Sequence, residues 1–215
     1  FALLHGALGN SERLRLLRLL GGNTRSVADW KWYRSPTGGW EQRPRIINMS
    51  RTGDFGVGSY TYLREPLPEP LQELRSALYT GLAAYANDDL ERHRREVAPK
   101  PFAVKSYPSS LDAFHEMCRE AKKPQALPTC LVLHYEAGGR NNVHRDIYGC
   151  VSFPYQALLM LSDPVADFRG GSFFLQPERS PDHGRRRLRL AAGDLLVFKS
   201  SIWHGAEEAL LMLSD

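Results

Sequence analysis

The sequence predicts an α+β protein in which helices and a hairpin precede a β core. Leucines recur at helical spacing in the first part of the chain. After about residue 128, short apolar or alternating runs are separated by Gly, Pro and Asp at nearly regular intervals. The 215 residues are enough for one sizeable hydrophobic core. We expect one domain over residues 1–215, with a helical and hairpin part at 1–127 and the β core at 128–215.

Three helices are expected in the first part. Residues 11–20 (SERLRLLRLL) place leucines among arginines, and Ser11 is a suitable helix cap. Residues 69–95 form a long helical pattern, and residues 109–121 form another that begins near Ser109 or Ser110. The apolar side of the long pattern consists of Leu71, Leu74, Leu78, Leu82 and Tyr85.

Strands are expected on both sides of the two later helices. Residues 46–63 (IINMSRTGDFGVGSYTYL) predict a strand, a Gly-rich turn and a second strand, which the prolines of residues 64–70 end. From residue 128 the runs TCLVLHYEAGG, FPYQALLMLSD, GSFFLQ, RRRLRLAAGD and DLLVFKSSIWHG follow the pattern of a β-sandwich or barrel.

Composition excludes several classes of protein. The three cysteines, Cys118, Cys130 and Cys150, lack CxxC spacing, which argues against a disulfide framework and a thiolate zinc site. An intracellular location, cytoplasmic or nuclear, fits this cysteine usage. No apolar run is long enough to cross a bilayer, so no membrane partner is expected. The chain begins at Phe1 rather than Met, and we expect it to be part of a longer protein. The net charge of +4 agrees weakly with an anionic partner.

A candidate metal site lies in the segment NNVHRD. His144 and Asp146 are two residues apart, so on a strand their side chains project from the same face. A second imidazole would complete a facial triad and leave open positions on an octahedral metal. An HxD pair alone also fits a surface histidine beside a salt bridge. The distal ligand is best assigned to His204, which follows the turn and apolar strand AAGDLLVF.

The other histidines are weaker candidates. His134 lies ten residues before His144, and on the same strand it would share a face with that ligand. His183 falls in an Arg-rich loop. His134 could line the pocket, but a structural histidine with satisfied hydrogen bonds is the preferred interpretation. We expect no metal at His183 or at His5, His93 and His115 in the helical part.

The motifs HRD, FRGGSFFL, GDLLVF and HG follow one another in an order and spacing that resemble the Fe(II)/2-oxoglutarate dioxygenases. Residues 45–198 are similar to bacterial members of this superfamily that act on alkylated DNA, relatives of the AlkB-type demethylases. The segments that carry the closer resemblance are SRTGDFGVGSYTYLREPLPEPLQELRSALY and LVLHYEAGGRNNVHRDIYGCVSFPYQALLMLSDPVADFRGGSFFL.

The resemblance implies a double-stranded β-helix (jelly-roll) core with the N-terminal helices packed against it. It implies Fe(II) on His144, Asp146 and His204, with 2-oxoglutarate as cosubstrate. Tyr135, nine residues before His144, matches a tyrosine that hydrogen-bonds the cosubstrate. A core tyrosine with a satisfied hydroxyl is the alternative. The implied reaction hydroxylates a C–H bond, and an N-methyl group is then lost as formaldehyde.

The sequence departs from the family at the far carboxylate of 2-oxoglutarate. Relatives carry an arginine about ten residues after the distal histidine, but GAEEALLMLSD at 205–215 contains no Arg or Lys. Residues 157–163 also recur letter for letter as residues 209–215, so this end of the chain is unusual. Three explanations are open. The usual C-terminal strand is absent, the protein does not use 2-oxoglutarate in the usual way, or another basic residue takes the place of the arginine. The candidates are Arg169, Arg187, Arg189 and Lys199.

A modified base in DNA or RNA is the expected substrate. Three features agree with it: the basic net charge, the cluster WKWYR at residues 30–34, and a Gly-rich hairpin at residues 51–60 that could cover a flipped base. The cluster could equally pack on the barrel. The alternatives are hydroxylation of a small molecule or amino acid, and a catalytically silent binding module with the same fold.

Overall fold

The computed structural model describes residues 1–20, 32–34, 40–42, 47–51, 55–63, 65–100, 102–121, 130–179 and 184–212. It combines helices with antiparallel sheets, as the sequence predicts. The helices are α1 (Asn10–Leu19), α2 (Glu69–Asp88), α3 (Leu90–Val97) and α4 (Leu111–Glu120). The strands are β1 (Ala2–Leu4), β2 (Trp32–Arg34), β3 (Trp40–Gln42), β4 (Ile47–Asn48), β5 (Gly56–Val57), β6 (Ser59–Tyr62), β7 (Leu131–His134), β8 (Arg140–His144), β9 (Tyr155–Leu159), β10 (Phe168–Gly170), β11 (Phe173–Gln176), β12 (Arg186–Leu188), β13 (Leu195–Lys199), β14 (Trp203–Ala206) and β15 (Ala209–Met212).

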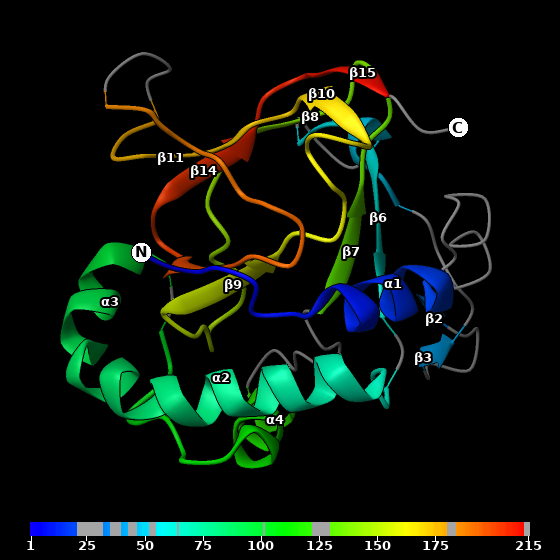
Figure 1. Ribbon diagram of the computed structural model, residues 1–215. Coiled ribbons are helices and arrows are strands. Elements are labelled where there is room, and N and C mark those ends of the chain that lie inside the picture. The colour runs from blue at the N-terminus through cyan, green and yellow to red at the C-terminus, as the bar shows by residue number, and fades with distance from the viewer. Residues whose placement is uncertain are drawn as a thin grey trace.

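Two sheets enclose the β core. One has the order β12-β11-β14-β8-β5, and the other has the order β1-β13-β9. Neighbouring strands in both run antiparallel. The helices α2 and α4 pack beneath β9, while β8, β11 and β14 lie on the other side of the core (Figure 1). A third sheet, β4-β6-β7, runs beside them.

The space between the two main sheets is filled by large apolar side chains, each worth about 1.5–3 kcal/mol when fully buried. A second cluster joins α2 to the segments around Tyr107 and Val151. The first cluster consists of Phe173, Leu175, Leu188, Leu190, Leu196 and Phe198. Because strand side chains alternate, this inward set fixes which residues of β11 and β13 face outward.

The predicted long helix at 69–95 is wrong in its length, because the chain divides into α2 and α3 at Asp89. The buried carboxylate of Asp89 lies 2.7 Å from Nζ of Lys199 on β13 and 2.8 Å from Nε of Arg92. This tertiary contact overrides the local helical pattern. The predicted apolar side is also rotated, since Tyr85 is 64% exposed and the buried residues are Tyr79, Ala83 and Ala86.

The other two helices lie where the sequence predicts them, but only one has the predicted cap. The α4 cap is Ser110, whose side chain accepts a hydrogen bond from the Ala113 amide. Ser11 is not the cap of α1, because the helix begins one residue earlier and Gly9 occupies the capping position. The Glu12 carboxylate accepts a hydrogen bond from the Gly9 amide and so satisfies a backbone donor at the N-terminus of the helix.

The predicted strand, turn and strand at 46–63 are confirmed as β4 and β6, which pair antiparallel. Between them β5 crosses to pair with Arg140 and Asn141 at the start of β8, which adds an edge strand to the five-stranded sheet. His134 and His144 lie on different strands, because a turn containing Gly138 separates β7 from β8. The described helices include none that is long and apolar enough to span a membrane.

The repeated heptapeptide occupies two different environments. Its first copy begins with the last three residues of β9, which pair with β13. Its second copy begins as β15, which pairs with β10 and exposes Leu210 and Leu211. Identical residues therefore take different roles because their neighbours differ, and residues 213–215 lie outside the described part.

Candidate metal centre

Two neighbouring strands bring the candidate ligands together. His144 ends β8 and His204 lies in β14, where the two residues are direct cross-strand partners. The register shifts between His204 and Ala206, the kind of irregularity that re-aims side chains at the end of a strand. Asp146 follows β8 by two residues, and its carboxylate meets both rings.

The three ligand groups converge on one point. The Asp146 carboxylate lies 3.1 Å from Nε2 of His204 and 3.6 Å from Nε2 of His144. One ligand atom from each residue falls within 4.8 Å of the others. Two imidazoles and one carboxylate form the facial set of non-haem Fe(II) oxygenases.

Backbone carbonyls hold both imidazoles in the orientation that a metal needs. Nδ1 of His144 lies 2.7 Å from the Asn142 carbonyl, and Nδ1 of His204 lies 3.0 Å from that of Ile202. A carbonyl only accepts, so each Nδ1 carries the proton and donates it. Nε2 of each ring therefore faces Asp146 and is the nitrogen available to a metal ion, as in metal-binding histidines whose second nitrogen is anchored.

Burial and charge shift the pKa values of His144 and Asp146 in the directions that favour metal binding. Burial, with the neighbouring His204, lowers the pKa of His144. Burial alone would raise the pKa of Asp146, but the hydrogen bond and charge from His204 outweigh it, so this pKa is lowered. A neutral imidazole and an ionised carboxylate are the forms that coordinate metal. The residues present therefore fit Fe(II).

Aromatic rings form an apolar wall around His204. Its ring lies 5.1 Å from that of Phe198 and 5.9 Å from that of Phe173, measured between centroids. Phe55 meets His144 edge-on at 6.4 Å. Sequence reasoning missed this wall, although FRGGSFFL and GDLLVF supply two of its three residues.

Three tyrosines lie near the Asp146 carboxylate. Tyr135 hydrogen-bonds Asn141, and burial raises its pKa, so its hydroxyl stays protonated. Burial likewise raises the pKa values of Tyr62 and of Tyr148, whose hydroxyl bonds Asp146. Only Tyr135 was predicted; the place of Tyr148 two residues after Asp146, on the same side of an extended chain, is a signal that could have identified it.

A glycine makes room for Tyr135. Gly58 has φ of +147°, and a Cβ there would lie 2.7 Å from Cδ1 of Tyr135. Only glycine adopts this conformation without strain. The Gly-rich turn predicted from the sequence thus ends directly against a predicted site residue.

The basic residues considered for binding 2-oxoglutarate have described contacts that do not include the three metal ligands. Arg169 is exposed on β10, and its guanidinium donates to the carbonyls of Val165 and Phe168. Arg187 pairs with Glu207, and Lys199 pairs with Asp89. Arg189 is exposed.

The remaining histidines have other partners. His93 is fully buried and lies 3.0 Å from the Ser152 hydroxyl, and His5 lies 3.0 Å from the Asp194 carboxylate. His115 and His134 belong to no metal-binding group of described residues, whereas His144, Asp146 and His204 do. His183 lies outside the described residues, as do Trp30 and Lys31 of the cluster at 30–34; the backbone of its last three residues forms β2.

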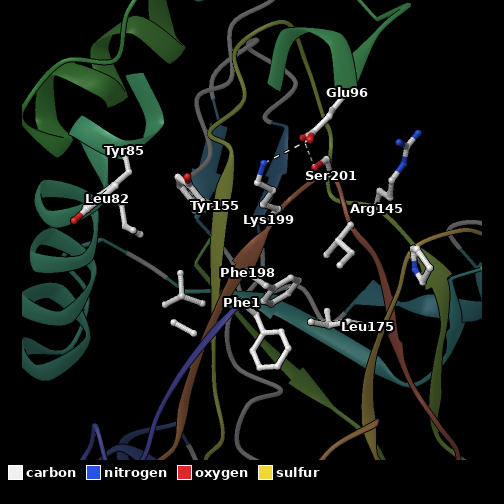
Figure 2. A pocket seen from close by; sticks show the side chains of 14 residues that line it. Phe1, Leu82, Tyr85, Glu96, Arg145, Tyr155, Leu175, Phe198, Lys199 and Ser201 are labelled. Atoms are coloured by element: carbon white, nitrogen blue, oxygen red, sulfur yellow. Dashed lines mark hydrogen bonds and ion pairs between the residues drawn. The ribbon is translucent and has the colours of Figure 1, made fainter. Parts of the chain in front are cut away.

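A pocket of about 700 Å³ lies near the metal centre, between α2, α3, the start of the chain and strands β9 and β13. Phe198 belongs both to this pocket and to the wall around His204. Figure 2 shows Glu96 at the upper side, joined to Lys199 and Ser201, with Arg145 farther along the wall. The metal ligands themselves are not part of the lining.

Comparison with known proteins decides the family. Residues 58–202 match the model of a family described as oxygenases catalysing oxidative methylation of damaged DNA. The chain belongs to this oxygenase family. Membership confirms the enzyme class predicted from the sequence, and the ligand set agrees with Fe(II) and 2-oxoglutarate as its cofactors.

The individual relatives share only part of their sequence with this oxygenase. It is 34% identical over 134 residues to uncharacterized proteins of Mycobacterium tuberculosis strains CDC 1551 and H37Rv, covering 62% of this chain and 53% of each relative. The chain thus spans about half the length of the curated relatives it matches. Its fold is similar to a Pseudomonas putida prolyl-4-hydroxylase, with TM-score 0.54, 12% identity, and coverage of 98% and 86% of the two chains.

Proposed function

We propose that this chain is an Fe(II)- and 2-oxoglutarate-dependent oxygenase that removes a methyl group from a modified nucleic-acid base by oxidation. The observation that supports this most is the convergence of His144, Asp146 and His204 within 4.8 Å. The damaged-DNA description of the family supports a nucleic-acid substrate. An intracellular location, cytoplasmic or nuclear, goes with such a substrate.

We infer that the two main antiparallel sheets form the jelly-roll core of a single domain over residues 1–215. The strand order β12-β11-β14-β8 and the facing pair β13-β9 support this arrangement. The likeness in fold to the prolyl-4-hydroxylase supports it as well. The boundary near residue 128 then separates the helical and hairpin part from the core.

In this proposal Nε2 of His144, Nε2 of His204 and the Asp146 carboxylate would hold the iron. When bound, Fe(II) supplies the activation of dioxygen that side chains cannot provide. The carbonyls of Asn142 and Ile202 keep the two rings in the binding tautomer. The rings of Phe173 and Phe198 exclude water from the side of His204.

The chain's part in holding 2-oxoglutarate falls first to Tyr135. Its protonated hydroxyl, near Asp146, can donate to a carboxylate. Arg169 would have to leave the carbonyls of Val165 and Phe168 to bind the far carboxylate. That exchange replaces neutral acceptors by an ionised one, which strengthens the hydrogen bonds.

The reaction balances without any further reactant. Dioxygen provides one oxygen atom to 2-oxoglutarate, which becomes succinate and carbon dioxide. The other oxygen enters a C–H bond of the N-methyl group. The resulting hydroxymethyl group then breaks its C–N bond, leaving formaldehyde, while the nitrogen recovers a proton.

The test is release of succinate and formaldehyde from a methylated single-stranded oligonucleotide. The unmethylated oligonucleotide and His144→Ala serve as controls. The proposal predicts both products in equal amounts, with iron and the methyl group required. Succinate release stimulated by a free amino acid but by no oligonucleotide would indicate a small-molecule hydroxylase. Metal binding without turnover of any substrate would indicate a silent module.

A further inference from the structure

The outer face of the five-stranded sheet carries an unusual group of arginines on aromatic rings. On β14, His204 points into the core, so Trp203 on its other side points outward. The Arg145 guanidinium lies 4.6 Å from the centre of the Trp203 ring, and that of Arg179 lies 5.9 Å from it. We call Arg145, Arg179 and Trp203 the arginine–tryptophan rim.

The rim is joined to the metal centre by the chain itself. Arg145 stands between His144 and Asp146, and Trp203 immediately precedes His204. Arg145 also lines the pocket beside the site (Figure 2). The rim therefore lies at the same end of β8 and β14 as the metal ligands, although its side chains project from the opposite face of these strands.

The arginines of the rim lack the carboxylate partner that several of the other described arginines have. Arg187 and Arg185 share Glu207, Arg140 pairs with Glu208, and Arg75 pairs with Glu65. Within the described ranges, no carboxylate lies within the 4.0 Å ion-pair distance of Arg145 or Arg179. Their charges thus remain available to an anionic partner, while the indole holds the guanidinium planes in place.

A second cation–aromatic pair borders this face but is closed. Phe174 on β11 is buried, with the Arg185 guanidinium 4.0 Å from the centre of its ring, and Arg185 is already paired with Glu207. The helices α2 and α4 pack on the other side of the core (Figure 1). The rim, an aromatic ring flanked by two cations without carboxylate partners, suits single-stranded nucleic acid, because bases stack on rings and phosphates pair with guanidinium groups.

We propose that the arginine–tryptophan rim binds the sugar–phosphate backbone next to the target base, with Arg145 and Arg179 each contacting a phosphate and Trp203 offering its ring to a base. This assignment rests on the proposed function, and it names the surface that presents a single strand to the metal centre. An acidic protein partner is the alternative that the experiment separates.

The test is binding of a fluorescein-labelled, unmethylated single-stranded oligothymidylate to the Mn(II)-loaded protein, followed by anisotropy at several salt concentrations. For Arg145→Gln/Arg179→Gln, the slope of log affinity against log salt should fall by roughly 1.4, about 0.7 for each lost phosphate contact. For Trp203→Leu, affinity should fall roughly fivefold to a hundredfold, the effect of one lost base stack.

The matched control is Arg15→Gln/Arg18→Gln, which removes two exposed charges from α1. It separates local contacts from net charge, and its salt slope should equal that of the unchanged protein. Thermal melting and Co(II) titration of all variants check that the fold and metal ligands are intact.

Equal salt slopes and affinities for the rim and control variants would overturn the inference. So would failure of the unchanged protein to bind the oligonucleotide, or binding of an acidic peptide in its place. Succinate release stimulated by a methylated oligonucleotide, measured in parallel, tests the proposed function separately. If that release occurs while the rim variants bind normally, only the rim assignment fails.

Discussion

Gly205 controls the distance between the two histidine ligands, and Gly205→Ala tests this directly. A Cβ at Gly205 would lie 2.6 Å from the Asn141 carbonyl oxygen on β8 and 2.7 Å from Cζ of Phe174 on β11. The glycine follows His204 on β14, so it lies where β14 approaches both neighbouring strands. Alanine therefore forces β14 to move relative to β8, which carries His144.

The size of the effect can be estimated from these contacts. Ordinary contact begins at 3.4 Å, so the strands must separate by about 0.8 Å, the difference between 3.4 and 2.6 Å. A metal site tolerates ligand errors of only about 0.2 Å. We expect metal affinity to fall by about 10- to 100-fold, as when outer contacts of a ligand are lost. Overpacking should cost about 1–3 kcal/mol in unfolding free energy.

The assay is Co(II) titration, with thermal melting of the metal-free protein. At this chain length, the cost lowers the melting temperature by roughly 2–12 °C. The matched control is Gly81→Ala in α2, where a Cβ meets nothing within 4 Å. It should stabilise the helix by about 0.5–1 kcal/mol and leave metal affinity unchanged. Unchanged metal affinity in Gly205→Ala would refute the reasoning.

Three further predictions concern single groups. Tyr135→Phe should weaken 2-oxoglutarate binding by roughly 10- to 100-fold through loss of a hydrogen bond to a charged group, while metal affinity measured by Co(II) titration stays the same. Metal affinity should not depend on pH above about pH 6.5, because the pKa values of His144 and Asp146 are both lowered. It should decline in more acidic solution. A loss of affinity that begins well above that pH would contradict this prediction. Burial lowers the pKa of His93, so its stabilising effect is complete above its unfolded pKa of about 6.5 and is lost as pH falls below it. Urea unfolding of His93→Gln should therefore vary less between about pH 5 and 6.5 than that of the unchanged protein, and an equal pH slope refutes this assignment.

The ligand set could be predicted because its signals are local. His144 and Asp146 are two residues apart, and His204 follows a recognisable turn and strand. The strand positions after residue 128 likewise follow from alternating apolar residues and turn residues. These patterns act over a few residues, so sequence alone retains them.

Contacts between distant segments could not be predicted in this way. The break at Asp89 depends on Lys199, which lies far along the chain on β13. The buried position of His93 depends on Ser152 in the same manner. The neighbouring Arg92, Arg94 and Arg95 are exposed, so nothing local distinguishes His93 as the buried member of this basic run.

The stacking of Arg145 on Trp203 also joins residues that are far apart in sequence. Each residue was visible beside a predicted ligand, but nothing local indicated that they touch. Their contact depends on the pairing of β8 with β14, which is the same pairing that joins the two histidines.

The most direct test of the central claim is an anaerobic titration of the metal-free protein with Fe(II) and then 2-oxoglutarate, with His144→Ala as the control. We expect a visible metal-to-ligand charge-transfer band that grows with 2-oxoglutarate and is absent from the variant. Iron binding without the band would keep the ligand set but contradict its use of 2-oxoglutarate. Failure to bind iron at all would contradict the metal centre formed by His144, Asp146 and His204.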